Sequence, residues 1–143
     1  MIEHFTIEPR ITIELDDHAD PYEPGESMSG SYRVDTSQPR DVKAVELSVL
    51  WYTIGQGEED LAVHHFLRRS IDDHLEEVSP SMGLGSAERF QTVLPNSPLS
   101  YDGVIVKVQW CVRVRVFLAR GKEVFAERPF RLGKLPPANV VPS

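Results

Sequence analysis

The chain has 143 residues, of which 41% are hydrophobic and 26% are charged, and its formal net charge at pH 7 is −7. This length predicts one domain with a core of its own, and this composition is typical of a globular protein. The acidic balance argues against binding nucleic acid through its phosphates, and the single cysteine excludes an intrachain disulfide. The first residues lack the pattern of a signal peptide, and no apolar run reaches the ~20 residues of a membrane helix. We therefore expect a cytoplasmic protein without a transmembrane segment.

Five strands are predicted in the first two thirds of the chain, where apolar and polar residues alternate between turn-forming segments. They cover residues 10–15, 28–35, 42–55, 61–69 and 87–94, and residues 4–9 offer one more candidate. In the third strand, the odd positions are expected to face the core: Val45, Leu47, Val49 and Trp51. The acidic stretch 71–86 is expected to be a loop, with room for one helical turn.

The longest predicted strand covers residues 104–118. Its even positions are all apolar: Val104, Val106, Val108, Trp110, Val112, Val114, Val116 and Leu118. Its odd positions are mostly polar, so the strand should bury one face, with Trp110 as the large central anchor. At ~3.3 Å per residue it would span roughly 50 Å, which predicts a bent strand that runs the full height of a large sandwich.

A turn at Arg120-Gly121 leads to a return strand over residues 123–132, in which Pro129 indicates a sheet edge or a bulge. Residues 134–143 are too rich in proline to pair within a sheet and are expected to be a tail, so that residues 1–133 form the domain. Seven or eight strands without a convincing long helix predict an all-β fold. We expect two antiparallel sheets packed as an immunoglobulin-like sandwich.

Three motifs follow one another in a distinctive order: "PYEPGESMSGSYRV", "ELSVLWYTIGQG" and "FQTVLPNSPLSYDGVIVKVQWCVRVRV". Pro24-Gly25 suits a type II turn, and the prolines of the third motif stop one strand and force an extended crossover. In this order and spacing the motifs resemble one domain of the arrestin-like superfamily. That superfamily includes the arrestins, the arrestin-domain trafficking adaptors, the retromer's arrestin-like subunit and a bacterial sporulation-control protein. The resemblance covers residues 11–132 and is most specific over residues 90–114.

The resemblance implies a protein that binds other proteins through sheet surfaces and loops and does no chemistry. We accordingly expect a non-enzymatic adaptor or scaffold without a cofactor, whose partner is another protein. A self-assembling structural subunit, that is, a homo-oligomer, is the alternative. A carbohydrate-binding module is a weaker one, because only Tyr52, Phe66 and Phe117 are candidates for exposed aromatic residues. Members of the superfamily usually carry two such domains, and this chain has the length of one.

Candidate residues for catalysis or metal binding are sparse. His64 and His65 are adjacent, so a regular strand would point them to opposite faces. His64, Asp72, Asp73 and His74 are the set that a turn after Arg69 brings closest together, but their spacing fixes no ligand geometry. Cys111 has no neighbouring base, and no nucleophile elbow or phosphate loop occurs. We expect no catalytic residue and no metal site.

The charge is unevenly distributed along the chain. Residues 1–99 hold 7 Lys and Arg against 19 Asp and Glu, whereas residues 100–134 hold 8 against 3. Pairing between acidic and basic strands would explain this, and so would a basic strip that docks an acidic partner or a partner strand. The candidate partner-binding residues lie on the long strand and the return strand: Lys107, Arg113, Arg115, Arg128 and Arg131. Glu46 is the acid expected to neutralise them if pairing is the explanation.

Overall fold

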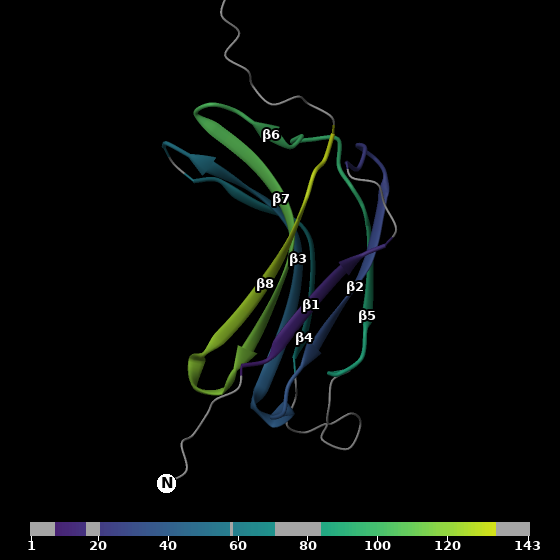
Figure 1. Cartoon of the computed structure of the whole chain (residues 1–143), viewed down its shortest axis with the longest axis vertical. Coiled ribbons are helices and arrows are strands. Elements are labelled where there is room, and N and C mark those ends of the chain that lie inside the picture. Colours follow the sequence, from purple (N-terminus) through teal and green to yellow (C-terminus); the bar gives the residue numbers. More distant parts are fainter. Residues whose placement is uncertain (1–7, 17–20, 58, 71–83, 134–143) are drawn as a thin grey trace, which may run out of the picture.

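The computed structural model describes residues 8–16, 21–57, 59–70 and 84–133, and eight strands lie within these ranges (Figure 1). The strands are β1 (Arg10–Leu15), β2 (Ser27–Asp35), β3 (Val42–Gly55), β4 (Leu61–Ser70), β5 (Glu88–Val93), β6 (Tyr101–Asp102), β7 (Val106–Leu118) and β8 (Glu123–Phe130). Two three-residue 3-10 helices connect strands that are consecutive in the chain: η1 (Pro39–Asp41) lies between β2 and β3, and η3 (Ala119–Gly121) lies between β7 and β8. In these described ranges there is no helix with the length and apolar character needed to cross a membrane.

The strands form two antiparallel sheets. One sheet has the order β1-β2-β5, and the other has the order β4-β3-β7, with both β6 and β8 pairing with β7. Figure 1 shows the two sheets packed face to face, with β2 and β5 on the right. The ends of β3 and β7 bend away from the smaller sheet at the upper left. The predicted all-β, two-sheet sandwich is therefore confirmed.

The predicted strands are observed, and β3 has the predicted bounds. The long strand begins at Val106, because Val104 and Ile105 lie in the turn from β6, where they are 70% and 69% exposed. The Gly103 N–H donates to the Val106 carbonyl at 2.9 Å and closes this turn. β6 was not predicted, and β8 ends two residues earlier than expected. The candidate strand over 4–9, the acidic loop and the tail fall largely or wholly outside the described residues.

The core lies between the sheets and follows the predicted parity. Trp110, Val112, Val114 and Val116 of β7 are buried there, as are Val45, Leu47 and Val49 of β3 and residues Met28, Tyr32, Val34 and Phe90 of the smaller sheet. The indole N–H of Trp110 donates to the Pro98 carbonyl at 2.7 Å, which ties the proline crossover to the core. Alternating β-branched side chains suit this half-buried surface and explain why the run of valines forms one strand.

Hydrogen bonds at the Pro24-Gly25 turn and at Ser100 hold two loops of the sandwich in place. Gly25 has φ 81°, and the Glu26 N–H donates to the Glu23 carbonyl at 3.0 Å, which confirms the predicted turn at Pro24-Gly25. Ser100 is buried, and its hydroxyl accepts a hydrogen bond from the Leu132 N–H at 2.7 Å. These contacts hold the crossover against the end of β8.

One exposed ion pair links the end of β1 to β5. Arg89 donates to Asp16, and the Ser29 hydroxyl donates to the same carboxylate at 2.6 Å. The hydrogen bond from Arg89, followed by that from Ser29, lowers the pKa of Asp16 from 3.8 to about 2. A lowered pKa stabilises the folded state above the unfolded pKa, and this contribution disappears as the pH falls through the folded value.

We therefore expect Asp16→Asn to lower the thermal midpoint at pH 6. The difference from wild type should shrink below about pH 4 and become small near pH 2, because about half of the wild-type carboxylate is then protonated in the folded state. Scanning calorimetry of both proteins from pH 2 to 6 measures this. A difference that does not change with pH would mean that Asp16 acts through packing rather than charge.

Candidate partner-binding site

The register of β7 places three of the five predicted residues on the outer face of the larger sheet. Lys107, Arg113 and Arg115 lie opposite Ile54, Ser48 and Glu46 of β3. Arg128 of β8 lies opposite Val112, so it shares the face of the core side chains instead. Arg131 follows the end of β8, where it forms an ion pair with Asp102 at 2.9 Å. The fold therefore does not gather the five residues into one strip.

Neighbouring strands supply acids to the arginines of the outer face. Arg113 pairs with Glu127 at 3.0 Å, and Arg115 pairs with Glu123 at 2.6 Å and lies 4.0 Å from Glu46. Arg115 also stacks over the Phe117 ring, 4.9 Å from its centroid. These pairs neutralise the centre of the predicted strip, with acids that come mainly from β8, while the predicted acid Glu46 makes the longer contact.

Beneath these charges, Cys111 is fully buried although it lies on the outer face of the sheet. Its thiol donates to Glu127 at 3.2 Å. Burial, with this hydrogen bond as a second cause, raises the pKa of Cys111 far above its usual value. A buried thiol of this kind is inert as a nucleophile.

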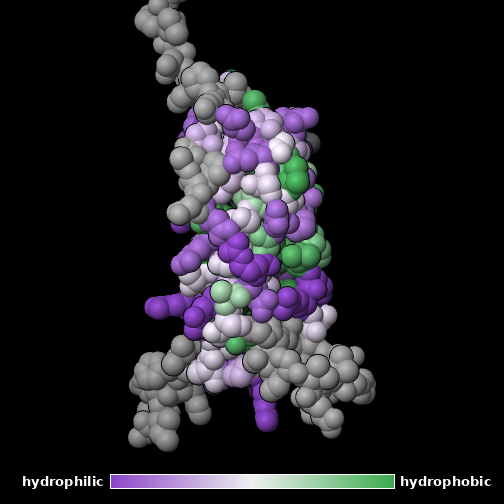
Figure 2. Space-filling model, turned by 90° about the vertical axis from the view of Figure 1, so that its right-hand side faces the viewer, coloured by the Kyte–Doolittle hydropathy of each residue, from purple (hydrophilic) through white to green (hydrophobic). Residues whose placement is uncertain are grey.

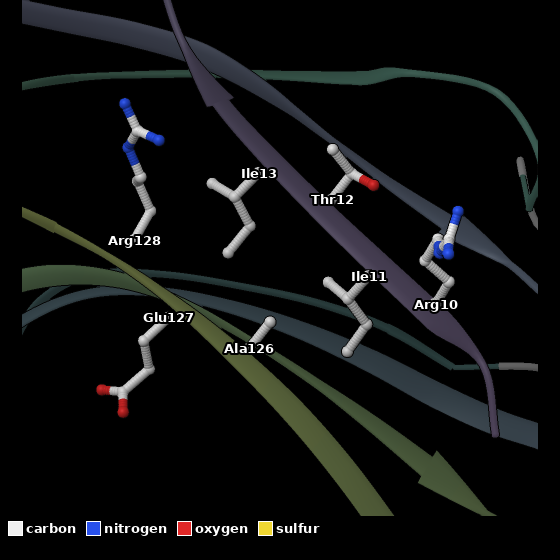
Figure 3. Close-up of a pocket in the computed structure, with 7 residues that line it drawn as sticks. All are labelled: Arg10, Ile11, Thr12, Ile13, Ala126, Glu127 and Arg128. Carbon is white, nitrogen blue, oxygen red and sulfur yellow. The ribbon is translucent and has the colours of Figure 1, made fainter.

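Arg128 is in a different position, beside a groove between β1 and β8. The groove has a volume of about 440 Å³ and is lined by Arg10, Ile11, Thr12, Ile13, Ala126, Glu127 and Arg128. Figure 3 shows Ile11, Ile13 and Ala126 pointing into the space between the two strands, with Arg128 extending from β8 toward β1. Arg10 and Thr12 lie on the far side of β1, and Glu127 lies on the far side of β8. The groove thus has an apolar floor and a cationic end.

Both strands that border the groove are sheet edges. In the described part of the chain, β1 pairs only with β2, and β8 pairs only with β7. Each edge strand therefore carries backbone N–H and C=O groups on one side that no described strand uses. Neither Arg10 nor Arg128 forms an ion pair with any described residue, in contrast to Arg113 and Arg115.

The sequence predicted one side of this groove. Pro129 marked β8 as an edge, and Arg128 was selected for its charge. Nothing in the sequence pointed to Arg10, Ile11 or Ile13, because the alternation of β1 shows which side chains face inward and not which strand lies next to them. Only the topology brings residues 10–13 beside residues 126–128.

The histidines are arranged differently from the prediction. The register between β3 and β4 shifts at Val49/Leu50, so that His64 is the extra residue of a bulge and His65 lies opposite Val49. His64 reaches the other sheet, with Nε2 2.8 Å from the Val93 carbonyl oxygen. Because Val49 faces the core, the bulge places both histidines on the inner face rather than on opposite faces.

Among the described residues, no three His, Cys, Asp or Glu side chains are placed to hold a metal ion. Asp72, Asp73 and His74 of the candidate set lie outside the described residues.

The two packed sheets, the long β7 spine and the proline crossover make this chain a single β-sandwich with the arrestin-like fold. The solved structure of Spo0M, a sporulation control protein from Bacillus subtilis, matches it with a TM-score of 0.58 and 17% sequence identity. The match covers 89% of this chain and 50% of that chain, so this chain spans about half the length of the Spo0M structure. No family model matches the sequence, and no curated protein matches it either. At this identity the similarity establishes the fold.

Proposed function

We propose that this chain is a non-enzymatic, cytoplasmic adaptor that binds an extended, acidic segment of a partner protein in the groove between β1 and β8. The observation that carries the proposal is that β1 and β8, two edges that no other described strand covers, border one apolar groove, and that Arg128 at its end has no ion-pair partner among the described residues. The arrestin-like fold supports a binding role, since the superfamily resemblance implies work through sheet surfaces.

The backbone of the groove supports recognition by strand addition. An edge strand offers main-chain hydrogen bonds to any extended segment, and alternate side chains of that segment give specificity. Ile11, Ile13 and Ala126 provide the apolar surface for every second side chain of such a segment. A volume of about 440 Å³ holds several side chains and lies within the range of ordinary binding pockets.

The charges of the groove favour an acidic segment. Arg128 has no ion-pair partner among the described residues, and its guanidinium can bind a carboxylate through two parallel hydrogen bonds. Glu127 does not oppose this, because it lies on the other face and is paired with Arg113 at 3.0 Å. The neutralised arginines of the outer face lack this property, which is why the groove is preferred to the strip.

The test begins with selection of twelve-residue peptides on the full chain by phage display, followed by fluorescence anisotropy with a labelled selected peptide. We expect acidic peptides with alternating apolar residues. Arg128→Glu should weaken binding roughly tenfold to a hundredfold, because a charge-assisted hydrogen bond contributes about 1.5–3 kcal/mol. Ala126→Phe should weaken it as well by filling the groove floor.

Arg40→Glu is the matched control, since Arg40 is exposed in η1 and does not line the groove. It makes the same charge change and should leave the affinity unaltered. Circular dichroism of each variant checks that the fold is retained. Selected peptides that bind Arg128→Glu and Ala126→Phe as tightly as wild type would overturn the proposal, and so would a selection that yields no binding peptide.

A further inference from the structure

A second sheet edge, β4, lies on the side of the molecule opposite the groove. Among the described residues β4 pairs only with β3, and it is ten residues long, whereas strands usually have five or six. Natural edge strands are commonly protected by charged side chains, proline, short length or a bulge. β4 has the bulge at His64 and two arginines near its end, but it contains no proline, and residues 61–67 include no Lys, Arg, Asp or Glu. The first seven residues of this long edge therefore have little protection against pairing apart from the bulge.

The side chains of β4 are unusually apolar for an exposed edge. Leu61, Val63, Phe66 and Leu67 are 52%, 49%, 49% and 43% exposed. The register places Leu61, Val63 and Phe66 on the outer face, beside the buried Leu50 and the half-buried Tyr52 of β3. A large part of this apolar surface would leave water if another strand lay against β4.

Exposed hydrophobic side chains are concentrated on β4. Among the described residues ten large hydrophobic side chains are exposed, and four of them belong to this strand. The face shown in Figure 2, on the side of β2 and β5, is largely hydrophilic, with most of its hydrophobic groups toward the right-hand margin and a few near the middle. A cluster of exposed apolar side chains is typical of a protein interface.

Charge distribution along β4 indicates what the partner is. The acidic residues Glu59 and Asp60 precede the strand, and the basic residues Arg68 and Arg69 lie near its end. Within the described residues, neither acidic side chain has an ion pair. The two arginines pair with Glu46 and Glu88 inside the chain, yet their side chains remain 46% and 52% exposed. Each guanidinium has five N–H donors, so it can donate to a second carboxylate as well.

We propose that β4 pairs with β4 of a second copy of this chain in antiparallel orientation, which joins two five-stranded sheets into one continuous sheet. A two-fold axis across an edge strand requires antiparallel pairing, and this places the acidic end of each copy beside the basic end of the other. Parallel pairing would instead bring like charges together. The edge is complementary to itself in both apolar surface and charge.

This inference does not depend on the proposed peptide groove. β4 and the β1–β8 groove lie at opposite edges of the sandwich, so the dimer keeps two open grooves. A partner with two acidic segments would then bind the dimer more tightly than a single domain, because the second contact becomes intramolecular.

Sedimentation equilibrium of the full chain, at concentrations from roughly 1 to 200 µM, tests the proposal. The mass should rise from 16.2 kDa toward twice that value in wild type. Val63→Lys places a charge on the strand edge and should weaken dimerisation at least tenfold. Val104→Lys is the matched control, since Val104 is exposed in the β6–β7 turn, and it should dimerise as wild type does.

A charge exchange distinguishes pairing at β4 from any other contact. Glu59→Lys/Asp60→Lys makes both ends of the edge basic, and Arg68→Glu/Arg69→Glu makes both ends acidic. Each variant alone should stay at 16.2 kDa, whereas an equimolar mixture should form the one-to-one dimer. A wild-type mass of 16.2 kDa throughout the range would overturn the proposal, as would dimerisation of Val63→Lys equal to that of Val104→Lys.

Discussion

Replacement of Trp110 with alanine is expected to lower the free energy of unfolding by about 3–5 kcal/mol, which is the range for large aromatic residues in cores. Trp110 is buried between the sheets, with its ring centroid 5.8 Å from that of Phe130 and 6.2 Å from that of His64. The substitution also leaves the Pro98 carbonyl without the indole N–H that it accepts at 2.7 Å. Domains are commonly stable by only 5–15 kcal/mol, so the variant should be close to unfolding at 37 °C.

Urea denaturation followed by circular dichroism measures this loss, and Trp110→Phe is the control. Phenylalanine keeps an aromatic ring in the core but has no N–H, so its cost should be smaller, about 1–3 kcal/mol. A loss below about 1 kcal/mol for the alanine variant would show that Trp110 is not the anchor between the sheets.

Gly30→Ala is expected to lower the free energy of unfolding by about 1–3 kcal/mol, the usual cost of adding atoms to a packed site. Gly30 lies in β2, the central strand of the smaller sheet, where its neighbours leave no room for a side chain. An added Cβ would collide with the Glu14 carbonyl oxygen of β1 and lie 2.9 Å from Cζ of Phe90. The first neighbour is backbone, so the β1–β2 pairing itself must shift to accept it.

Ser31→Ala is the matched control, because it changes the next residue of the same strand without adding an atom. It should alter stability by less than about 0.5 kcal/mol. Thermal unfolding of both variants against wild type gives the comparison. If Gly30→Ala were no less stable than Ser31→Ala, the close approach of β1, β2 and β5 would be wrong.

The period of two along the chain was sufficient to predict most of the fold. In β3 and β7 it identified the core face, including Trp110. Side chains at every second position point to the same face of a strand, and apolar, β-branched side chains on that face are buried when two sheets pack together. It failed at Val104, which has the right character and parity but lies in a turn. In sequence, the apolar residues of this turn cannot be distinguished from those of a strand. The turn is defined by the hydrogen bond from the Gly103 N–H to the Val106 carbonyl, which the sequence does not reveal.

The candidate site was less predictable, because it depends on neighbours rather than on periodicity. The sequence identified Arg113 and Arg115 as outward-facing, but not that Glu127 and Glu123 would neutralise them. Arg128 looked similar to them in sequence and lies on the opposite face. The groove combines strands from the two ends of the chain, and no local pattern carries that information.

Ion pairs explain little of the uneven charge along the sequence. Among the described residues one pair joins the two parts of the chain, Glu46 with Arg115 at 4.0 Å, whereas Arg113, Arg115 and Arg131 pair mainly with acids of their own segment. Arg10 and Arg128 are the bases beside the groove that have no ion-pair partner among the described residues. Basic residues that remain unpaired in a neutralised surface are the ones expected to meet a partner.

Hydrogen–deuterium exchange of the full chain, with and without a selected acidic peptide, locates the bound peptide on the sheets. We expect the peptide to slow amide exchange in β1 and β8, because their edge N–H groups become hydrogen-bonded to the added strand. Exchange in β4 and on the outer face around Arg113 should not change. Protection confined to β4 or to the β3–β7 pair, with none in β1 or β8, would contradict binding in the groove between β1 and β8.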